Sequence, residues 1–189
     1  GSTYTYLTVA RLPRVEAETG LSFEWRPFSV RAIMVEQNNV PFRGKPIKSN
    51  YMWRDIERRA GKYGLPVKVP APYPLEEFDL ANRVAVLGLQ EGWCAEYVQA
   101  AYRRWFVDGL EAGSEPNLAE SIREAEQDPV RVIASANSEV VRSAYEAATD
   151  EARDLNIFGS PTFNVGGEVF WGDDRLEDAV AWHRNGRLD

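Results

Sequence analysis

The residues best suited to binding chemistry lie near the carboxyl end, in residues 157–174, which read IFGSPTFNVGGEVFWGDD. A proline at the first position of a strand, after Gly159 and Ser160, favours a cis bond before Pro161. Such a bond turns the N–H and C=O of Ser160 outward, where they could pair with an extended ligand. The segment is therefore typical of a site that holds a peptide-like molecule.

Short elements around these residues would hold them in place. Residues 162–165 are predicted to form a strand, which a tight Gly-Gly turn joins to a returning strand over residues 169–171. Asp173 or Asp174 is then predicted to cap a helix that continues through Trp182.

A second group of interest stands at the amino end. Ser2 and Thr3 precede a predicted helix that ends at Gly20, a favourable residue just past a helix. Free N–H groups and the positive end of the helix dipole favour an anion there. The apolar positions of this helix are Leu7, Ala10, Leu12, Val15 and Ala17.

The remaining patterns describe how these two ends are positioned. Residues 21–26 alternate apolar and polar side chains, as a half-buried strand does. Helices are predicted over residues 51–64, over 78–107 with an interruption near Gly92, from an Asn117 cap, and over 137–156, while residues 41–50 are a polar loop. Helix and strand at one end, with strand, hairpin and helix at the other, predict an α/β layer whose middle is helical.

Composition excludes several classes of function. The 189 residues are 44% hydrophobic, carry a net charge of −7 and contain no apolar run long enough for a membrane span. The negative charge argues against nucleic acid or an anionic membrane as a partner. Cys94 is the single cysteine and His183 the single histidine of the sequence. An internal disulfide is therefore impossible, no Cys/His zinc site can form, and no metal is expected. A reducing cytoplasm is the expected location.

Four groups of residues, in order along almost the whole chain, match one family pattern. They are residues 1–7 (GSTYTYL); Asn39-Val40-Pro41 with Lys48 and Tyr51-Met52; Asp55-Ile56-Glu57-Arg58 with Gly64-Leu65-Pro66; and FGSPTF with FWGDDRL near the carboxyl end. In these the chain resembles 2-hydroxychromene-2-carboxylate isomerase and the kappa-class glutathione transferases, a branch of the DsbA-like thioredoxin fold.

The resemblance implies an α/β, thioredoxin-like fold with a large helical insertion. The thioredoxin-like domain would comprise residues 1–30 and 138–189, and the insertion residues 31–137. The family has a first strand directly before the Ser2 loop, and this sequence starts at the loop. We therefore expect that strand to be absent from this chain, or Gly1 and Ser2 to be a remnant of cloning.

The resemblance also implies a glutathione site. Ser2 would hold the glutathione sulfur as a thiolate, which a hydroxyl donor and a helix amino terminus both favour. The backbone of Ser160, before Pro161, would pair with the cysteinyl part. The γ-glutamyl end would be held by Trp171, Gly172, Asp173 and Asp174, and Asn39 and Lys48 would face the substrate.

The activity implied is a glutathione-dependent conversion of 2-hydroxychromene-2-carboxylate to trans-o-hydroxybenzylidenepyruvate. A thiolate adds to the conjugated system, the resulting single bond rotates, and the thiolate leaves, so that glutathione is a cofactor and a small aromatic carboxylate is the substrate. Family members commonly form dimers, and residues 93–106 would offer an aromatic face. The alternatives are a kappa-type glutathione transferase and a non-redox, DsbA-like binding protein.

A disulfide oxidoreductase is disfavoured, because Ser2-Thr3-Tyr4-Thr5 stands where Cys-x-x-Cys would be required. Simpler roles exist for the site residues: Ser2 could cap the helix, Lys48 could be a solvated charge, Asn39 could cap a turn and Trp171 could pack in the hairpin. The other aromatic residues are expected in the core or in subunit contacts, Cys94 as a buried apolar residue, and His183 at a surface helix end.

Overall fold

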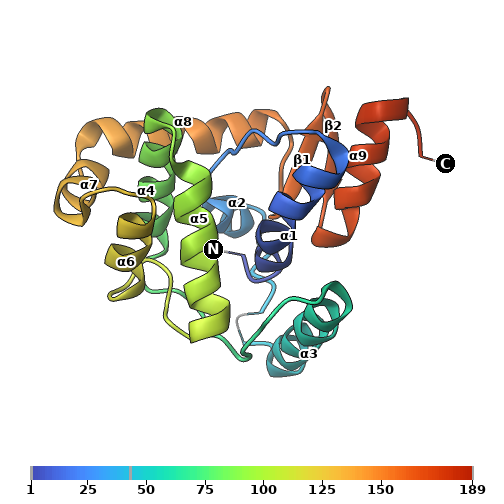
Figure 1. Ribbon diagram of the computed structural model, residues 1–189, viewed down its shortest axis with the longest axis horizontal. Helices are drawn as coiled ribbons and strands as arrows, with labels where there is room; N and C mark the ends of the chain where they lie inside the picture. Colours follow the sequence, from blue (N-terminus) through green and yellow to red (C-terminus); the bar gives the residue numbers. More distant parts are fainter. Residues whose placement is uncertain (1, 43, 189) are drawn as a thin grey trace.

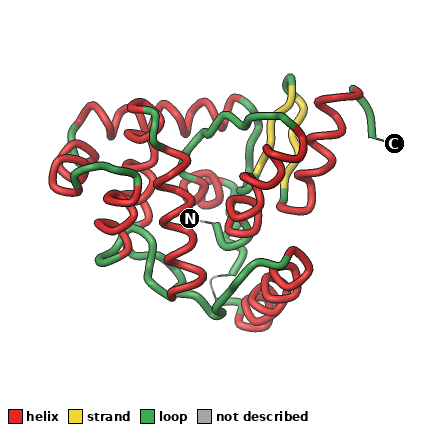
Figure 2. Tube along the Cα trace, in the orientation of Figure 1, coloured by secondary structure: helices red, strands yellow, loops and turns green. Residues whose placement is uncertain are grey.

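The computed structural model describes residues 2–42 and 44–188, so the predictions that include Gly1 fall partly outside the described residues. The elements, in chain order, are α1 (Thr5–Thr19), α2 (Val30–Glu36), α3 (Pro46–Tyr63), α4 (Phe78–Glu91), α5 (Cys94–Arg103), the π-helix η1 (Arg104–Asp108), α6 (Asn117–Glu124), α7 (Pro129–Ala136), α8 (Glu139–Asp154), β1 (Thr162–Val165), β2 (Glu168–Trp171), the 3₁₀ turn η2 (Asp173–Arg175) and α9 (Leu176–Asn185). Helices build most of the molecule, and the small antiparallel sheet packs against α9 (Figures 1 and 2).

The first helix forms as predicted. α1 begins at Thr5 and ends before Gly20, whose φ of 71° lies in the left-handed region that glycine adopts without strain. Leu7 and Leu12 are buried as expected, whereas Ala10 is exposed. Because its buried residues all lie between positions 6 and 12, the first half of α1 anchors the helix in the core.

The carboxyl-terminal hairpin is also confirmed. β1 pairs antiparallel with β2, with Thr162 opposite Trp171 and Val165 opposite Glu168. Gly166 and Gly167 have φ angles of 60° and 94°, the positive values that a two-residue primed turn requires. The predicted Asp cap is wrong, because neither η2 nor α9 has a side-chain cap.

Residues 20–29 form neither helix nor strand, contrary to the strand predicted for residues 21–26. Leu21, Phe23 and Trp25 are half-buried and alternate with the exposed Ser22 and Glu24, which is the pattern that suggested a strand. Alternation reports burial on one side, but a strand also needs a hydrogen-bonded neighbour. Within the described residues the sheet holds β1 and β2 alone.

The helical middle differs from the prediction at its boundaries. This helix was predicted to start at residue 51, but α3 begins at Pro46. Proline suits the first helical position, because the N–H that it lacks has no partner there. The break between α4 and α5 falls at Gly92, as expected. Asn117 is not a cap: its buried side chain donates to the carbonyls of Ala101 and Leu110, so it joins α6 to α5.

Two short helices escaped prediction. α2 is capped by the Ser29 hydroxyl, which accepts from the Ala32 N–H, and α7 is capped by Asp128, which accepts from Val130 and Arg131 N–H groups. Each spans about two turns, too short to show a convincing apolar period.

Two hydrophobic clusters organise the interior. One lies among α4 to α8 and includes Tyr97, Ile122 and Val132. The other combines α1, α3, α4 and η1 and includes Leu7, Ile56, Trp105 and Phe106, together with Met52. The amino end of α1 therefore shares one core with α3, although the predicted domain division places them in different segments; that division stays a prediction.

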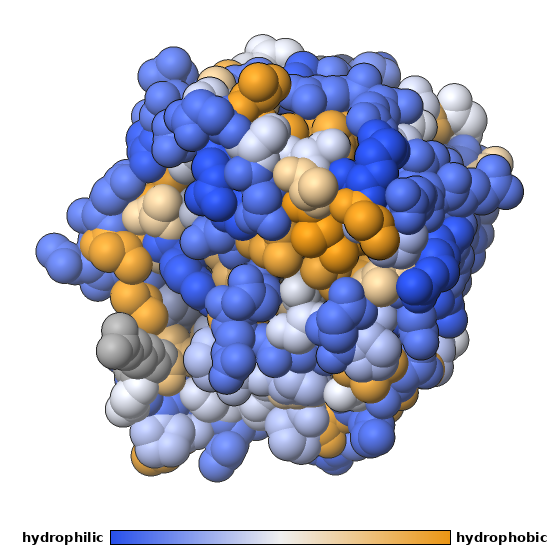
Figure 3. All heavy atoms as spheres, turned by 90° about the vertical axis from the view of Figure 1, so that its left-hand side faces the viewer, coloured by the Kyte–Doolittle hydropathy of each residue, from blue (hydrophilic) through white to orange (hydrophobic). Residues whose placement is uncertain are grey.

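The aromatic residues of α5 and η1 turn inward. Trp93, Tyr97, Trp105 and Phe106 are all buried within the chain, so they form no exposed aromatic face for a partner, and dimer formation stays a prediction. One side of the surface is mostly hydrophilic, with a hydrophobic patch near its middle (Figure 3). None of the helices formed by the described residues is both long and apolar enough to span a membrane.

Candidate functional site

The amino-terminal hydroxyl group and the proline loop meet in space. The Ser2 hydroxyl donates to the carbonyl oxygen of Ser160 at 2.6 Å, and the hydroxyls of Thr5 and Ser160 are 2.9 Å apart. The peptide bond between Ser160 and Pro161 is cis. Residues 158 positions apart in sequence are thus joined at one point, beside the first turn of α1.

Helix α5, from the helical middle of the chain, also contacts Ser2. Tyr102, on α5, donates its hydroxyl hydrogen to the Ser2 carbonyl oxygen at 3.3 Å. Burial raises the pKa of Tyr102 above that of free tyrosine, so the group stays protonated and remains a donor. Ser2 is therefore held between the proline loop and α5.

Thr3 and Tyr4, the two residues after Ser2, attach the loop before α1 to α3. The buried Thr3 hydroxyl lies 3.0 Å from the sulfur of Met52, and the Tyr4 hydroxyl donates to Asp55 at 3.0 Å. Burial, and then the bond to Asp55, raise the pKa of Tyr4. Since α1 begins at Thr5, the positive end of its dipole faces this hydroxyl-rich loop.

Lys48 and Asn39, the residues expected to face a substrate, are both exposed. Lys48 is exposed in the first turn of α3, one helical turn before Met52, and its amino group is 5.9 Å from the Phe42 ring centre. Spacing of four residues places it on the face of α3 that meets Thr3. Asn39 is exposed, and its N–H donates to the Met34 carbonyl. In the described part of the chain no recorded contact joins Asn39 to Ser2 or Ser160.

Trp171 forms an exposed edge of the hairpin. Its side chain is 51% exposed, and its ring centre is 4.9 Å from that of Phe158 in an edge-to-face contact. The indole packs closely over Gly159, where an added Cβ would come within 2.2 Å of the indole nitrogen. A glycine at position 159 is therefore required for the tryptophan to stand here.

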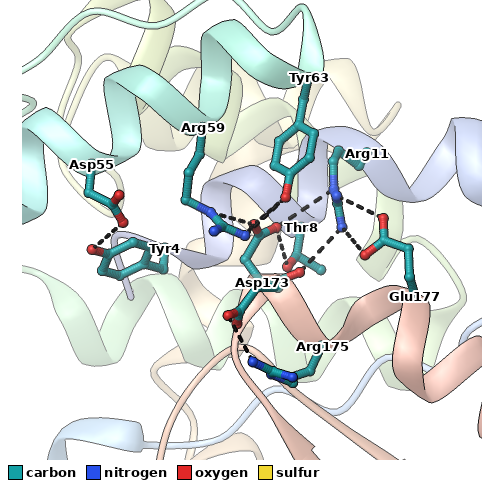
Figure 4. A network of polar contacts seen from close by, with 10 residues as sticks. Tyr4, Thr8, Arg11, Asp55, Arg59, Tyr63, Asp173, Arg175 and Glu177 are labelled. Atoms are coloured by element: carbon teal, nitrogen blue, oxygen red, sulfur yellow. Dashed lines mark hydrogen bonds and ion pairs between the residues drawn. The ribbon is translucent and has the colours of Figure 1, made fainter. Parts of the chain in front are cut away.

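The two aspartates after Trp171 have opposite environments. Asp173 is 2% exposed, and its carboxylate accepts from Arg59 at 2.8 Å and from Tyr63 at 3.3 Å (Figure 4). The side chain of Asp174 is 51% exposed and pairs with Arg175 at 3.3 Å. A ligand could reach Asp174, but it has no access to Asp173.

The buried carboxylate of Asp173 belongs to a network that joins three elements. Arg11 of α1 lies 3.6 Å from it and pairs at 2.9 Å with Glu177 of α9, while Arg59 reaches it from α3. Thr8 donates to its second oxygen at 3.3 Å. The buried groups are Arg11 and Asp173, and the partly exposed Arg59 and the exposed Glu177 complete a set of two guanidinium groups and two carboxylates that balance in charge. The carboxylate of Asp173 therefore has a structural role, and contact of Asp173 with a ligand stays a prediction.

The lone thiol is unsuited to redox chemistry. Cys94 is buried, and burial raises its pKa to about 12, so it carries no thiolate near neutral pH. His183 is exposed in the last turn of α9, as predicted. Across residues 2–42 and 44–188, no group of three His, Cys, Asp or Glu residues is placed to hold a metal ion.

Several residues at this site were not found from the sequence. Tyr102 carries no local signal, because its contact with Ser2 depends on how α5 packs against α1. Arg11 and Arg59 look like solvated helix charges until α1, α3 and α9 are brought together. A charged residue at a position that the helical period buries, as at Arg11 beside Leu12, is the one clue that could have been used.

Almost the whole chain is similar to known proteins. A family model for a DsbA-like thioredoxin domain matches residues 2–181. The chain is 29% identical over 184 residues to the 2-hydroxychromene-2-carboxylate isomerase of Sphingobium xenophagum, covering 93% of this chain and 90% of that protein. It is 24% identical over 190 residues to glutathione S-transferase kappa 2 of Caenorhabditis elegans, covering 93% and 84%.

A solved structure shares most of the architecture. That of a 2-hydroxychromene-2-carboxylate isomerase superposes with a TM-score of 0.83 at 25% identity, covering 94% of this chain and 87% of that one. An enzyme of the same name from Pseudomonas putida is 26% identical over 179 residues, covering 93% and 86%.

Proposed function

The chain belongs to the family of DsbA-like thioredoxin domains, and from this premise we propose that it is a glutathione-dependent isomerase of a small aromatic carboxylate. The substrate we propose is 2-hydroxychromene-2-carboxylate, converted to trans-o-hydroxybenzylidenepyruvate. The observation that carries the proposal is the 2.6 Å contact between the Ser2 hydroxyl and the Ser160 carbonyl, which brings the two halves of the expected site together. Relatives named as isomerases support the reaction class.

The residues present fit glutathione in part. Hydroxyl donors at the positive end of α1 suit a sulfur anion, and the exposed carboxylate of Asp174 suits an ammonium group. Ser2, the Ser160 backbone, Pro161, Trp171, Gly172 and Asp174 would hold the tripeptide. Glutathione held there would supply a thiolate able to add reversibly to a conjugated C=C bond.

The chain's own residues would bind and orient the reactants. The Ser2 hydroxyl turns from the Ser160 carbonyl to donate to the sulfur, which favours its charged form. The ammonium group of Lys48 would attract a substrate carboxylate, and Asn39 would offer amide hydrogen bonds nearby. Tyr102 would hold the Ser2 loop in the orientation this requires.

The test is a glutathione titration by calorimetry, followed by an assay of isomerisation with and without glutathione. We expect Ser2→Ala to lower glutathione-dependent turnover about 100-fold, the loss typical of removing one donor from a developing charge. Ser143→Ala, at an exposed position of α8, is the matched control and should leave turnover unchanged. No glutathione binding by intact protein, or full activity of Ser2→Ala, would refute the proposal.

A kappa-type transferase is the second candidate, favoured by the relative named glutathione S-transferase kappa 2. The two activities differ in what happens to glutathione: an isomerase returns it, whereas a transferase consumes it in a conjugate. Measuring free thiol during turnover separates them. A disulfide oxidoreductase remains disfavoured, because Cys94 is buried and burial raises its pKa, which opposes the thiolate that this chemistry requires.

A further inference from the structure

Asp55 lies on α3, in the motif of residues 55–58, and the proposed reaction assigns it no role. Its side chain is half-buried, and the Tyr4 hydroxyl donates to it at 3.0 Å. Among the described residues no ion pair of Asp55 is recorded, and Arg59, one turn along the helix, pairs with Asp173 instead. A half-buried carboxylate that lacks a cationic partner costs free energy. The presence of Asp55 is therefore better explained by what it holds in place than by the stability it adds.

Tyr4, the donor to Asp55, stands where the amino-terminal loop becomes helix α1. It occupies the N-cap position, and its carbonyl accepts from the Leu7 N–H at 3.1 Å. Its ring packs against the core cluster that contains Trp105. Ser2 precedes Tyr4 by two residues, which span at most about 7 Å, so a displacement of Tyr4 is passed on to Ser2. The bond to Asp55 therefore helps to fix the position of the Ser2 hydroxyl.

The same helix also holds the other wall of the candidate site. Arg59 follows Asp55 by four residues, which places both side chains on one face of α3, about 6 Å apart along its axis. Arg59 donates to Asp173 at 2.8 Å, and Asp173 directly precedes Asp174 (Figure 4). Adjacent turns of α3 thus hold the amino-terminal loop through Tyr4 and the turn η2 through Asp173.

The negative charge of Asp55 opposes the chemistry expected beside it. A carboxylate near a sulfur anion disfavours that anion, so the charge alone would not help to form a thiolate at Ser2. The carboxylate is instead a strong acceptor, since a hydrogen bond to a charged acceptor is about twice as strong as a neutral one. Burial, and then this bond, raise the pKa of Tyr4, so its hydroxyl stays protonated and remains the donor. Asp55 is therefore suited to positioning and not to stabilising charge.

We propose that Asp55 is a positioning residue of the proposed reaction: it holds the Tyr4 hydroxyl, and through Tyr4 the loop that presents the Ser2 hydroxyl to the glutathione sulfur. The inference rests on the proposed function and adds to it a residue that acts only through Tyr4. A misplacement of about 1 Å at a reacting group can lower a rate about 100-fold, so the loss of this bond should be visible in turnover.

Three substitutions separate position from charge. Asp55→Ala removes the acceptor, Tyr4→Phe removes the donor and keeps the ring, and Asp55→Asn removes the charge but keeps an oxygen that can accept from Tyr4. We expect the first two to lower kcat about tenfold and to leave the KM for glutathione within about twofold. Asp55→Asn should stay within about threefold of the original protein. The double variant of Asp55→Ala and Tyr4→Phe should be no slower than either single variant, because both remove the same bond.

Two binding measurements report on the sulfur end and do not require turnover. The pKa of the bound glutathione thiol, followed by thiolate absorbance against pH, should rise by about one unit in Asp55→Ala, which is a tenfold loss of thiolate. The affinity for S-methylglutathione, which has no ionisable thiol, should stay within about twofold of the original in the same variant. A merely structural role of Asp55 would weaken the binding of both ligands alike.

A second tyrosine–aspartate bond, outside the candidate site, provides the matched control. Tyr145 of α8 donates to Asp79 of α4 at 3.1 Å, so Tyr145→Phe makes the same chemical change as Tyr4→Phe. Tyr145→Phe should leave kcat within about twofold of the original and the pKa of the bound thiol unchanged, whatever its effect on the melting temperature.

Three results would overturn this inference and leave the proposed function standing. They are an unchanged kcat and thiol pKa in Asp55→Ala, equal losses in Asp55→Ala and Asp55→Asn, and losses in Tyr145→Phe as large as those in Tyr4→Phe. Failure of the original protein to bind glutathione would overturn both. If Asp55→Ala does not fold, Tyr4→Phe, which keeps the packed ring, makes the same test.

Discussion

The two walls of the candidate site are held in different ways. The amino-terminal wall, at Ser2, is positioned by neutral hydroxyl groups, with bonds of 2.6 Å to Ser160 and 3.3 Å from Tyr102. The carboxyl-terminal wall, at Asp174, is positioned by the neighbouring Asp173, whose buried carboxylate is paired with two arginines. Neutral hydrogen bonds can exchange partners at low cost, whereas a buried ion pair cannot lose one partner cheaply.

This difference suits the roles proposed for the walls. The hydroxyl of Ser2 must release the Ser160 carbonyl before it can donate to a ligand sulfur, so a weak and adjustable bond is appropriate. Asp174 needs only a fixed place, which the rigid turn η2 provides. The comparison therefore predicts that variants of the two walls will separate stability from ligand binding.

The largest expected effect is on the charged wall. Asp173→Ala leaves Arg11 and Arg59 without their shared buried partner, and we expect a loss of about 3–5 kcal/mol in the free energy of unfolding. Urea denaturation monitored by circular dichroism measures this loss. Asp174→Ala, one residue away and exposed, is the control and should change stability by less than about 0.5 kcal/mol. Equal effects of the two substitutions would contradict the contrast drawn here.

A smaller effect, on binding alone, is expected at Asp174. Asp174→Asn removes the negative charge proposed to face the ammonium group of glutathione, and its dissociation constant should rise about tenfold, equivalent to about 1.4 kcal/mol. Calorimetric titration gives the affinity, and thermal unfolding should show an unchanged melting temperature. Unaltered affinity would remove Asp174 from the ligand contacts. Glu168→Gln, at an exposed position of β2, tests whether any nearby loss of charge has the same effect.

The smallest effect is expected at the neutral wall. Tyr102→Phe removes one hydrogen bond to the Ser2 carbonyl, and we expect a loss of about 1 kcal/mol in the free energy of unfolding. Tyr51→Phe, at a side chain that is 61% exposed, serves as the reference and should have no measurable effect. A loss at Tyr102 as large as that at Asp173 would mean that the neutral wall is no more adjustable than the charged one.

The sequence was most informative where local chemistry determines structure. The Gly-Gly turn, the helix end at Gly20 and the cis bond before Pro161 follow from the conformational limits of one or two residues, and all are present. The DsbA-like thioredoxin fold is confirmed by the family model and by the structural neighbour.

Prediction failed where distant contacts decide the outcome. Residues 21–26 have the side-chain pattern of a strand but no partner, and pairing cannot be read from one segment. Asp173 and Asp174 are neighbours of the same type, yet one is buried and the other exposed, because only the first meets Arg11 and Arg59. The proposed roles of Ser2 and Asp174 are predictions that the experiments above test, and the proposed roles of Ser160 and Lys48 also stay predictions.

Gly159 has no side chain with which to touch a ligand, yet it determines where Trp171 stands. Any larger residue there would push the indole outward, and the hairpin would lose its aromatic rim without the loss of a single polar group. A screen that substitutes only residues with reactive atoms would overlook this position. If Trp171 contacts a ligand as proposed, ligand selectivity would change on mutation of Gly159, which lies behind the indole.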